Sequence, residues 1–156
     1  MIQRLIAAAL AALSLGIAAP AFAEAGVVSL KGEVKLVRQS IAADGRTTET
    51  LEDPNQVLPG DRLRFTTRYT NAGAQPATDF VLVNPLPGPV RLAVADGLEV
   101  SVDGGKSFGA LAALAVADGA GPARAAVLGD VTHVRWRFAS IAPGKSGEVT
   151  YLGEVR

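Results

Sequence analysis

The stretch Leu58 to Gly73 reads LPGDRLRFTTRYTNAG, and it decides the fold of this chain. Its middle part alternates apolar or aromatic side chains with arginines and threonines, which is the pattern of a strand with one buried face. The Pro-Gly pair before it and the Asn-Ala-Gly run after it favour turns, because proline fixes φ and glycine accepts positive φ. We therefore predict a strand over residues 62–70 between two turns. Its inward residues are Leu63, Phe65, Thr67 and Tyr69.

The same alternation recurs elsewhere in the chain and predicts further strands with one apolar face. They cover residues 27–38, 131–138 and 147–155. On the first of these strands, the apolar face holds Val28, Leu30, Val34 and Leu36. On the second, we expect Val134, Trp136 and Phe138 to point inward and close the core against residues 62–70. Trp136 is then a core residue between two sheets and not a platform for a ligand.

Turn signals divide the rest of the sequence into short segments. Asp44-Gly45 predicts a hairpin whose second strand is polar. Residues 78–83 are expected to pair with residues 62–70 through the turn at Asn71-Ala72-Gly73.

Two shorter strands, over residues 90–95 and 98–102, are expected to continue the chain as a meander. Residues 109–129 fit either a short helix or a strand, so their structure stays open. Short strands, 17 glycines and 9 prolines in 156 residues, and the lack of a sustained helical period together predict an all-β protein. We predict one domain over residues 24–156, an antiparallel β-sandwich.

The composition excludes several classes of partner and chemistry. Lys plus Arg equals Asp plus Glu at 15 each, so the net charge gives no attraction to nucleic acid or to anionic lipid. The sequence has no cysteine, which excludes a disulfide, a thiolate nucleophile, a zinc-cysteine site and a lipoprotein anchor.

Residues 1–23 have the features of a signal peptide. A positive start precedes an apolar run over residues 5–19, and the small-x-small pattern Ala21-Phe22-Ala23 follows it. We predict cleavage between Ala23 and Glu24. A membrane anchor is the alternative, but the run is shorter than the roughly 20 residues that span a bilayer. The product is expected in the periplasm or outside the cell, with no membrane span after processing.

Several turn and strand motifs occur in a fixed order along the chain. They are Leu58-Pro59-Gly60-Asp61, Thr70-Asn71-Ala72-Gly73, the segment SVDGGKSF at Ser101 to Phe108, Val134-Arg135-Trp136, and APGKSG at Ala142 to Gly147. Over about residues 50–156 this order resembles the bacterial conserved-repeat family of immunoglobulin-like domains, called domain of unknown function eleven. The resemblance implies an immunoglobulin-like sandwich in an exported protein and implies no catalytic residues.

The segment Ser101 to Phe108 also fits the Asp-box pattern, a hairpin turn held by its own side chains. Asp103 is expected to accept backbone N–H bonds across the turn, with Phe108 packed beneath. The alternative is a calcium loop that uses Asp96 and Asp103, but the segment lacks the dense carboxylates that six to eight oxygen ligands require. We therefore assign no metal ligand and no cofactor-binding residue.

His133 is the only histidine, and we expect it on the solvent-facing side of its strand. Ser101, Ser107 and Asp130 are available as partners in a Ser-His-Asp site, but no nucleophile-elbow pattern accompanies them. We assign no catalytic residue and expect a protein that is not an enzyme.

Five arginines on two predicted strands form a candidate basic stripe for an acidic glycan or phosphate. They are Arg62, Arg64, Arg68, Arg135 and Arg137. The alternative, which we favour, is a pair of solvated sheet faces whose arginines bind Asp and Glu of the same chain.

Two functions remain open. The first, which we favour, is an exported structural or interaction domain of the cell envelope, with a protein partner or with self-association through strand edges. A specific version is strand exchange: residues 27–37, which a long polar hairpin and loop separate from the main body, pair with the open edge of a neighbouring subunit and build a filament. The second is a small envelope module that binds carbohydrate or a metal ion. The sequence identifies no small-molecule ligand.

Overall fold

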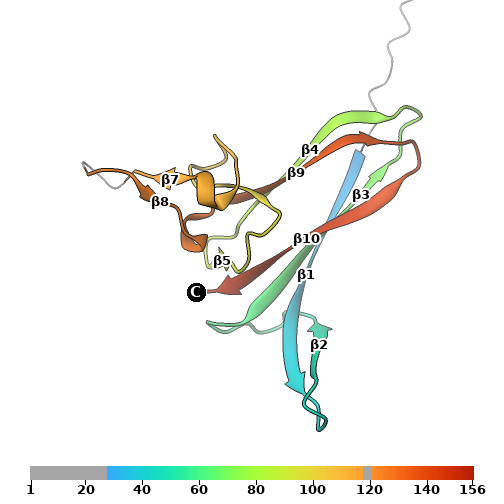
Figure 1. Cartoon of the computed structure of the whole chain (residues 1–156). Helices are drawn as coiled ribbons and strands as arrows, with labels where there is room; N and C mark the ends of the chain where they lie inside the picture. The colour runs from blue at the N-terminus through green and yellow to red at the C-terminus, as the bar shows by residue number, and fades with distance from the viewer. Residues whose placement is uncertain (1–27, 118–120) are drawn as a thin grey trace, which may run out of the picture.

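The structure is a computed structural model, and it describes residues 28–117 and 121–156 (Figure 1). These residues form antiparallel sheets that pack as an all-β sandwich, as predicted. The predicted signal peptide at residues 1–23, its cleavage site, and residues 118–120 of the segment left open by the sequence lie outside the described residues.

The larger sheet has β3 at its centre, and β3 is the strand predicted from the opening stretch. The strand order is β2-β1-β3-β10-β5. The strands are β1 (Val28–Ile41), β2 (Thr47–Glu52), β3 (Arg62–Asn71), β5 (Val90–Leu92) and β10 (Ser146–Val155). The face of this sheet that looks toward the smaller sheet is called the inner face below.

The smaller sheet has three strands in the order β4-β9-β6. They are β4 (Ala77–Pro85), β6 (Glu99–Ser101) and β9 (His133–Ile141). The segment left open by the sequence contains two 3₁₀ turns and a two-stranded ribbon: η1 (Leu111–Ala113), β7 (Ala115–Val116), β8 (Arg124–Ala125) and η2 (Leu128–Asp130). Neither turn is long or apolar enough to cross a membrane, and no other helix occurs in the described residues.

The core lies between the two sheets and is built on stacked aromatic rings. Phe65 of β3 stacks on Tyr151 of β10 with ring centroids 4.6 Å apart, and Trp136 of β9 lies 6.3 Å from Tyr151. Tyr69 of β3 meets Phe138 of β9 at 4.7 Å. The predicted closure of the core by residues of β3 and β9 is therefore confirmed.

The predicted hairpin between residues 62–70 and 78–83 is wrong. β4 pairs with β9 in the smaller sheet, whereas β3 pairs with β1 and β10 in the larger one. The chain therefore crosses the sandwich after β3 and does not fold back beside it.

The side chain of Asn71 explains this crossing. It is fully buried, and its Nδ2 donates to the carbonyl oxygens of Gln75 and Ile141 at 2.9 and 2.8 Å. Its Oδ1 accepts from the N–H of Gly73 at 3.0 Å. Because Ile141 ends β9 in the opposite sheet, the bond to its carbonyl oxygen attaches the end of β3 to the smaller sheet.

The predicted meander over residues 90–102 is wrong for a related reason. β5 pairs with β10 and β6 pairs with β9, so the two short strands belong to opposite sheets. The turn at Asp96-Gly97 is present, with Gly97 at φ 73°, but it connects the sheets and not two neighbours of one sheet.

The hairpin predicted at Asp44-Gly45 is confirmed, with Gly45 at φ 80°. Every residue of β2 is exposed, and the hairpin extends beyond the sandwich as an arm (Figure 1). Residues 28–37, the described part of the segment expected to exchange, pair with β3 of the same chain along their whole length.

Candidate functional site

The first half of β1 is an open sheet edge. β2 pairs with β1 only from Leu36 to Ile41, and β3 pairs with the opposite side of β1 from Val28 to Val37. Residues 28–35 therefore have a neighbouring strand on one side only within the described structure. An unpaired edge of this kind presents backbone donors and acceptors that a further strand can bind.

Two hydrogen bonds outside the paired ladders show which residues of β1 face the open side. Ala42 N–H donates to Arg46 across the hairpin, so even-numbered residues of β1 direct their backbone groups toward β2 and the open edge. Asn71 N–H donates to Lys145 on the β10 side, so Thr70 faces β1 and its opposite residue, Ser29, faces β3. Both bonds place the N–H and C=O groups of residues 30, 32 and 34 at the open edge.

Apolar side chains flank this edge on the inner face of the sheet. Leu30 and Val34 carry the predicted inward alternation, yet they are 53% and 36% exposed because the three-stranded sheet does not cover β1. Beside them, Gly32 and Val34 line an open groove of about 280 Å³ that continues to Phe65 and Tyr151. The open edge therefore combines free backbone groups with uncovered apolar surface.

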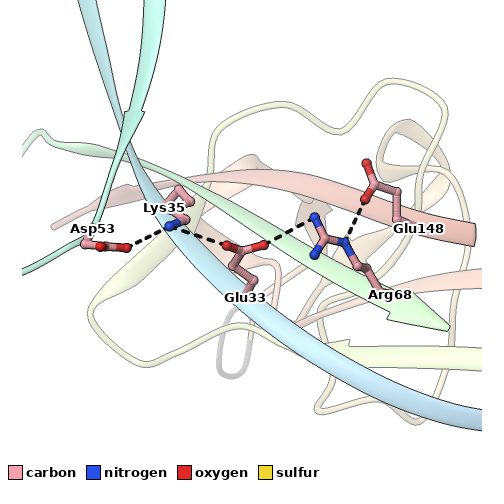
Figure 2. A network of polar contacts seen from close by, with 5 residues as sticks. All are labelled: Glu33, Lys35, Asp53, Arg68 and Glu148. Carbon is pink, nitrogen blue, oxygen red and sulfur yellow. Dashed lines mark hydrogen bonds and ion pairs between the residues drawn. The ribbon is translucent and has the colours of Figure 1, made fainter.

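The outer face of the same sheet carries a chain of ion pairs that crosses β1, β3 and β10 and reaches Asp53, just after β2 (Figure 2). Lys35 Nζ lies 2.7 Å from Asp53 and 3.4 Å from Glu33, and Arg68 lies 3.6 Å from Glu33 and 3.3 Å from Glu148. The hydrogen bond and charge of Asp53 raise the pKa of Lys35, and Lys35 lowers the pKa of Asp53 in return. Exposed pairs of this kind contribute little stability each, so their main effect is to orient the side chains beside the edge.

Lys31 stands outside this network. Its side chain is exposed on the same outer face, opposite Arg68 of β3, and has no hydrogen bond or ion pair in the described part of the chain. Two positive side chains lie next to each other at that point, which leaves Lys31 available to a carboxylate from outside.

The free edge of β4 is protected by comparison. Asp79 has φ 51°, a conformation that non-glycine residues rarely adopt, and it interrupts the pairing of β4 with β9. Pro85 ends the strand and has no N–H to donate. An exposed charge, a local distortion and a proline are features that prevent pairing at sheet edges.

The Asp103 turn is a self-contained structure, as expected. Asp103 accepts hydrogen bonds from the Ser101 hydroxyl at 2.7 Å, from the backbone N–H of Lys106 and Ser107 at 3.0 Å each, and from the Ser107 hydroxyl at 2.6 Å. These donors, the Ser107 hydroxyl first among them, hold the pKa of Asp103 well below its usual range. Asp96 is exposed and makes none of these contacts.

His133 is half-buried and packs on this turn. A Cβ added at Gly105 would lie 3.5 Å from the imidazole ring, and His133 Nδ1 lies 3.0 Å from the Thr132 hydroxyl. Phe108 contacts the Arg135 guanidinium, 4.2 Å above its ring.

The residues of the candidate Ser-His-Asp site are not brought together as a triad. Ser101 and Ser107 bind Asp103, and Asp130 binds Arg124 through two bonds of 2.7 Å. Arg124 and the backbone N–H of Val127 lower the pKa of Asp130 to about 2. In the part of the chain that is described, no group of three or more His, Asp or Glu side chains is placed to hold a metal ion.

The candidate basic stripe is divided between two faces. Arg64 and Arg68 lie on the outer face of the larger sheet, paired with Glu49 and with Glu33 and Glu148. Arg135 and Arg137 lie on the smaller sheet and share Glu99, whose pKa they lower, Arg135 most strongly. A shallow groove of about 480 Å³ contains Arg64 and Arg68, but acidic residues of the same network line it as well.

The sequence did not predict that Leu30 and Val34 lie at an open edge of β1. The exposed Leu30 and Val34 and the buried Leu36 belong to the same alternating pattern. The polar sequence of β2, TTETLE, was the available signal. A strand that is polar on both faces cannot pack in the core. It therefore indicates that the smaller sheet does not cover the end of the larger sheet that holds β1 and β2.

Comparison with family models, with curated proteins and with solved structures finds no match to this chain.

Proposed function

We propose that this protein is an exported, non-enzymatic structural or interaction domain of the cell envelope that binds a partner strand at the open edge of β1. The observation that supports the proposal most is the coincidence of free backbone groups at residues 30, 32 and 34 with the exposed side chains of Leu30 and Val34. Strand addition uses both features, since main-chain bonds supply affinity and alternate side chains supply specificity.

The compartment and the family are part of the same proposal. The signal-peptide pattern of residues 1–23 supports export to the periplasm or the cell exterior, and the motif order over about residues 50–156 supports an immunoglobulin-like member of the conserved-repeat family. A sandwich of this kind supplies a rigid scaffold that works through its edges and loops.

Export is tested by the mass of the protein recovered from cells. We expect the purified protein to begin at Glu24, because cleavage follows Ala23. Intact mass spectrometry with N-terminal peptide mapping measures this directly. A protein that retains residues 1–23 in the cytoplasmic fraction contradicts the assignment of the compartment.

The edge is tested by placing charges on it. The double variant Leu30→Lys with Val34→Lys puts two lysines on the inner face of the edge, which opposes strand addition but removes little buried surface. After chemical cross-linking in intact cells, we expect the wild-type protein to sediment in assemblies larger than one chain and the variant to sediment as a single chain.

The matched control is Val81→Lys with Val83→Lys on β4, since these valines are 44% and 41% exposed. The control should sediment like the wild type. Equal sedimentation of all three proteins would exclude the β1 edge as the binding surface.

The second candidate, a module for carbohydrate or metal, is tested at the Asp103 turn. Both oxygens of Asp103 already accept hydrogen bonds from the turn, so we expect millimolar calcium or chelator to leave the melting temperature unchanged. Asp103→Ala should lower the melting temperature by about 2 to 5 °C because it removes these bonds. Differential scanning calorimetry measures both. A rise in melting temperature with calcium that Asp103→Ala abolishes would favour the metal-binding module.

The carboxylate of Asp103 also makes the folding stability depend on pH in the acid range. Because the folded pKa of Asp103 lies below its unfolded value of 3.8, its stabilising contribution is complete above that pH and is lost as the pH falls below it. Asp130, with a pKa of about 2, acts in the same direction. The stability of Asp103→Ala should therefore depend less steeply on pH below about 4 than that of the wild type.

A further inference from the structure

We propose that the strand bound at the open edge is the same edge of a second copy of this chain, antiparallel, with Gly32 opposite the partner's Gly32. This inference rests on the proposed function and names the occupant and the register. Identical edges related by a two-fold axis form an isologous contact, and the two five-stranded sheets then become one continuous sheet.

The inner-face side chains fit this register. Directly opposite residues of an antiparallel pair project to the same face, so Leu30 and Val34 can meet only residues of the same parity. With Gly32 on the axis, Leu30 lies opposite the partner's Val34, and Val34 lies opposite the partner's Leu30. Each copy thus covers the apolar side chains that its own smaller sheet leaves exposed. The glycine on the axis leaves room for the two backbones to approach.

The outer-face charges fit the same register. Lys31, which has no ion pair in the described part of its own chain, lies opposite the partner's Glu33, and symmetry repeats the pair. Glu33 is held in position by Lys35 and Arg68 of its own chain. Opposite charges directly across a strand pair stabilise it.

Neighbouring registers place like charges together. Moving the axis to residue 31 puts Lys31 opposite the partner's Lys31. Moving it to residue 33 puts Glu33 opposite the partner's Glu33 and Lys31 opposite the partner's Lys35. Like charges directly opposite each other are destabilising, so the register centred on Gly32 is selected.

The length of the contact is also set by the fold. Pairing ends at residue 35 because Leu36 of each chain already pairs with Glu52 of its own β2. The contact therefore joins residues 29–35 of both copies. A contact of this size buries less surface than a standard protein interface, so we expect a dissociation constant on the order of 100 µM.

A single-cysteine variant tests the register. The chain has no cysteine, and a Cβ added at Gly32 has no heavy atom within 4 Å, so Gly32→Cys introduces one accessible thiol. Since the backbone groups of residue 32 face the edge, Gly32 and the partner's Gly32 form a hydrogen-bonded pair. The Cα atoms of such a pair are about 5.5 Å apart, which a disulfide can bridge.

At about 100 µM protein and under mild oxidation, we expect G32C to form covalent dimers at least about tenfold faster than Thr78→Cys, an exposed residue on the edge of β4. Equal rates, or a faster reaction of T78C, would overturn the proposed contact.

A charge swap tests the same contact without a new thiol. Lys31→Glu places like charges opposite each other twice, and we expect it to weaken dimerisation by about tenfold in sedimentation equilibrium. Adding Glu33→Lys to it restores the opposite charges and should return the dissociation constant to within about threefold of the wild type. Lys106→Glu, which makes the same change in net charge on an exposed turn, should have no effect. If the double variant has the melting temperature of the wild type but still dimerises as weakly as Lys31→Glu alone, this register is excluded.

Measurements on the purified protein and in cells distinguish the symmetric dimer from a complex with a different protein. A purified wild-type protein that stays monomeric up to about 1 mM excludes the symmetric dimer. If the assemblies in cells are nevertheless lost in the Leu30→Lys, Val34→Lys variant, the open edge binds a different protein and the proposed function stands. If those assemblies are unchanged, both fail.

Discussion

Replacing Tyr151 with alanine is expected to lower the free energy of unfolding by about 3 to 5 kcal/mol. Tyr151 is 5% exposed, stacks on Phe65 and lies against Trp136, so its ring joins both sheets. Urea unfolding followed by Trp136 fluorescence measures the change. Ile41→Ala on the exposed arm is the matched control, since Ile41 is 78% exposed and should lose less than about 0.5 kcal/mol.

Tyr151→Phe separates the ring from its hydroxyl. Burial raises the pKa of Tyr151 to about 12, above its ordinary value of 10.0. The neutral phenol therefore contributes fully below about pH 10, and this contribution is lost as the pH rises toward 12. Tyr151→Phe should keep the stability of the wild type near neutral pH and show a smaller loss between about pH 10 and 12. A loss near neutral pH as large as that of Tyr151→Ala would contradict the stacking account.

Replacing Asn71 with alanine is expected to lower the free energy of unfolding by about 2 to 3 kcal/mol. The substitution leaves the carbonyl oxygens of Gln75 and Ile141 and the N–H of Gly73 without the partners that the Asn71 amide provides. Unsatisfied polar groups at a buried position lose their bonds to water as well.

Asn84→Ala is the control for Asn71, because it removes one side-chain bond, from Nδ2 to the Thr67 hydroxyl, at a half-buried position. We expect it to lose about 1 kcal/mol in the same chemical unfolding measurement. If the two variants were equally stable, the Asn71 amide would not be what holds the crossing between the sheets.

β3 of the larger sheet and β9 of the smaller sheet were predictable from local pattern because alternate residues of each strand face the core and the solvent. Phe65 and Tyr69 alternate with arginines on β3, and Val134 and Trp136 alternate with His133 and Arg135 on β9. Such alternation follows from the two-residue period of a strand, and it is the same whichever strand is the neighbour in the sheet.

The assignment of strands to sheets was not predictable in the same way. Asn71 and Gly73 read locally as a hairpin turn, but the bond that redirects the chain goes to Ile141, 70 residues away. No local pattern near Asn71 carries that information. The turn at Asp96-Gly97 was misassigned for the same reason, since a tight turn does not say whether the next strand stays in its sheet.

The candidate site was missed because it depends on how many strands the opposite sheet contains. Leu30 and Val34 have the pattern of core residues and are uncovered only because the smaller sheet has three strands against five. The turn chemistry of Asp103, by contrast, is local, so its four donors could be expected from the sequence around it.

Hydrogen exchange at the backbone amides of β1 shows whether the edge of this strand is open. Amides 30, 32 and 34 should exchange rapidly in the isolated chain at low concentration, whereas amides 29, 31 and 33, which face β3, should be protected. In the assembled form, we expect amides 30, 32 and 34 to become protected while those of β4 do not change. Unchanged exchange at these three amides, or new protection along β4 instead, would contradict it.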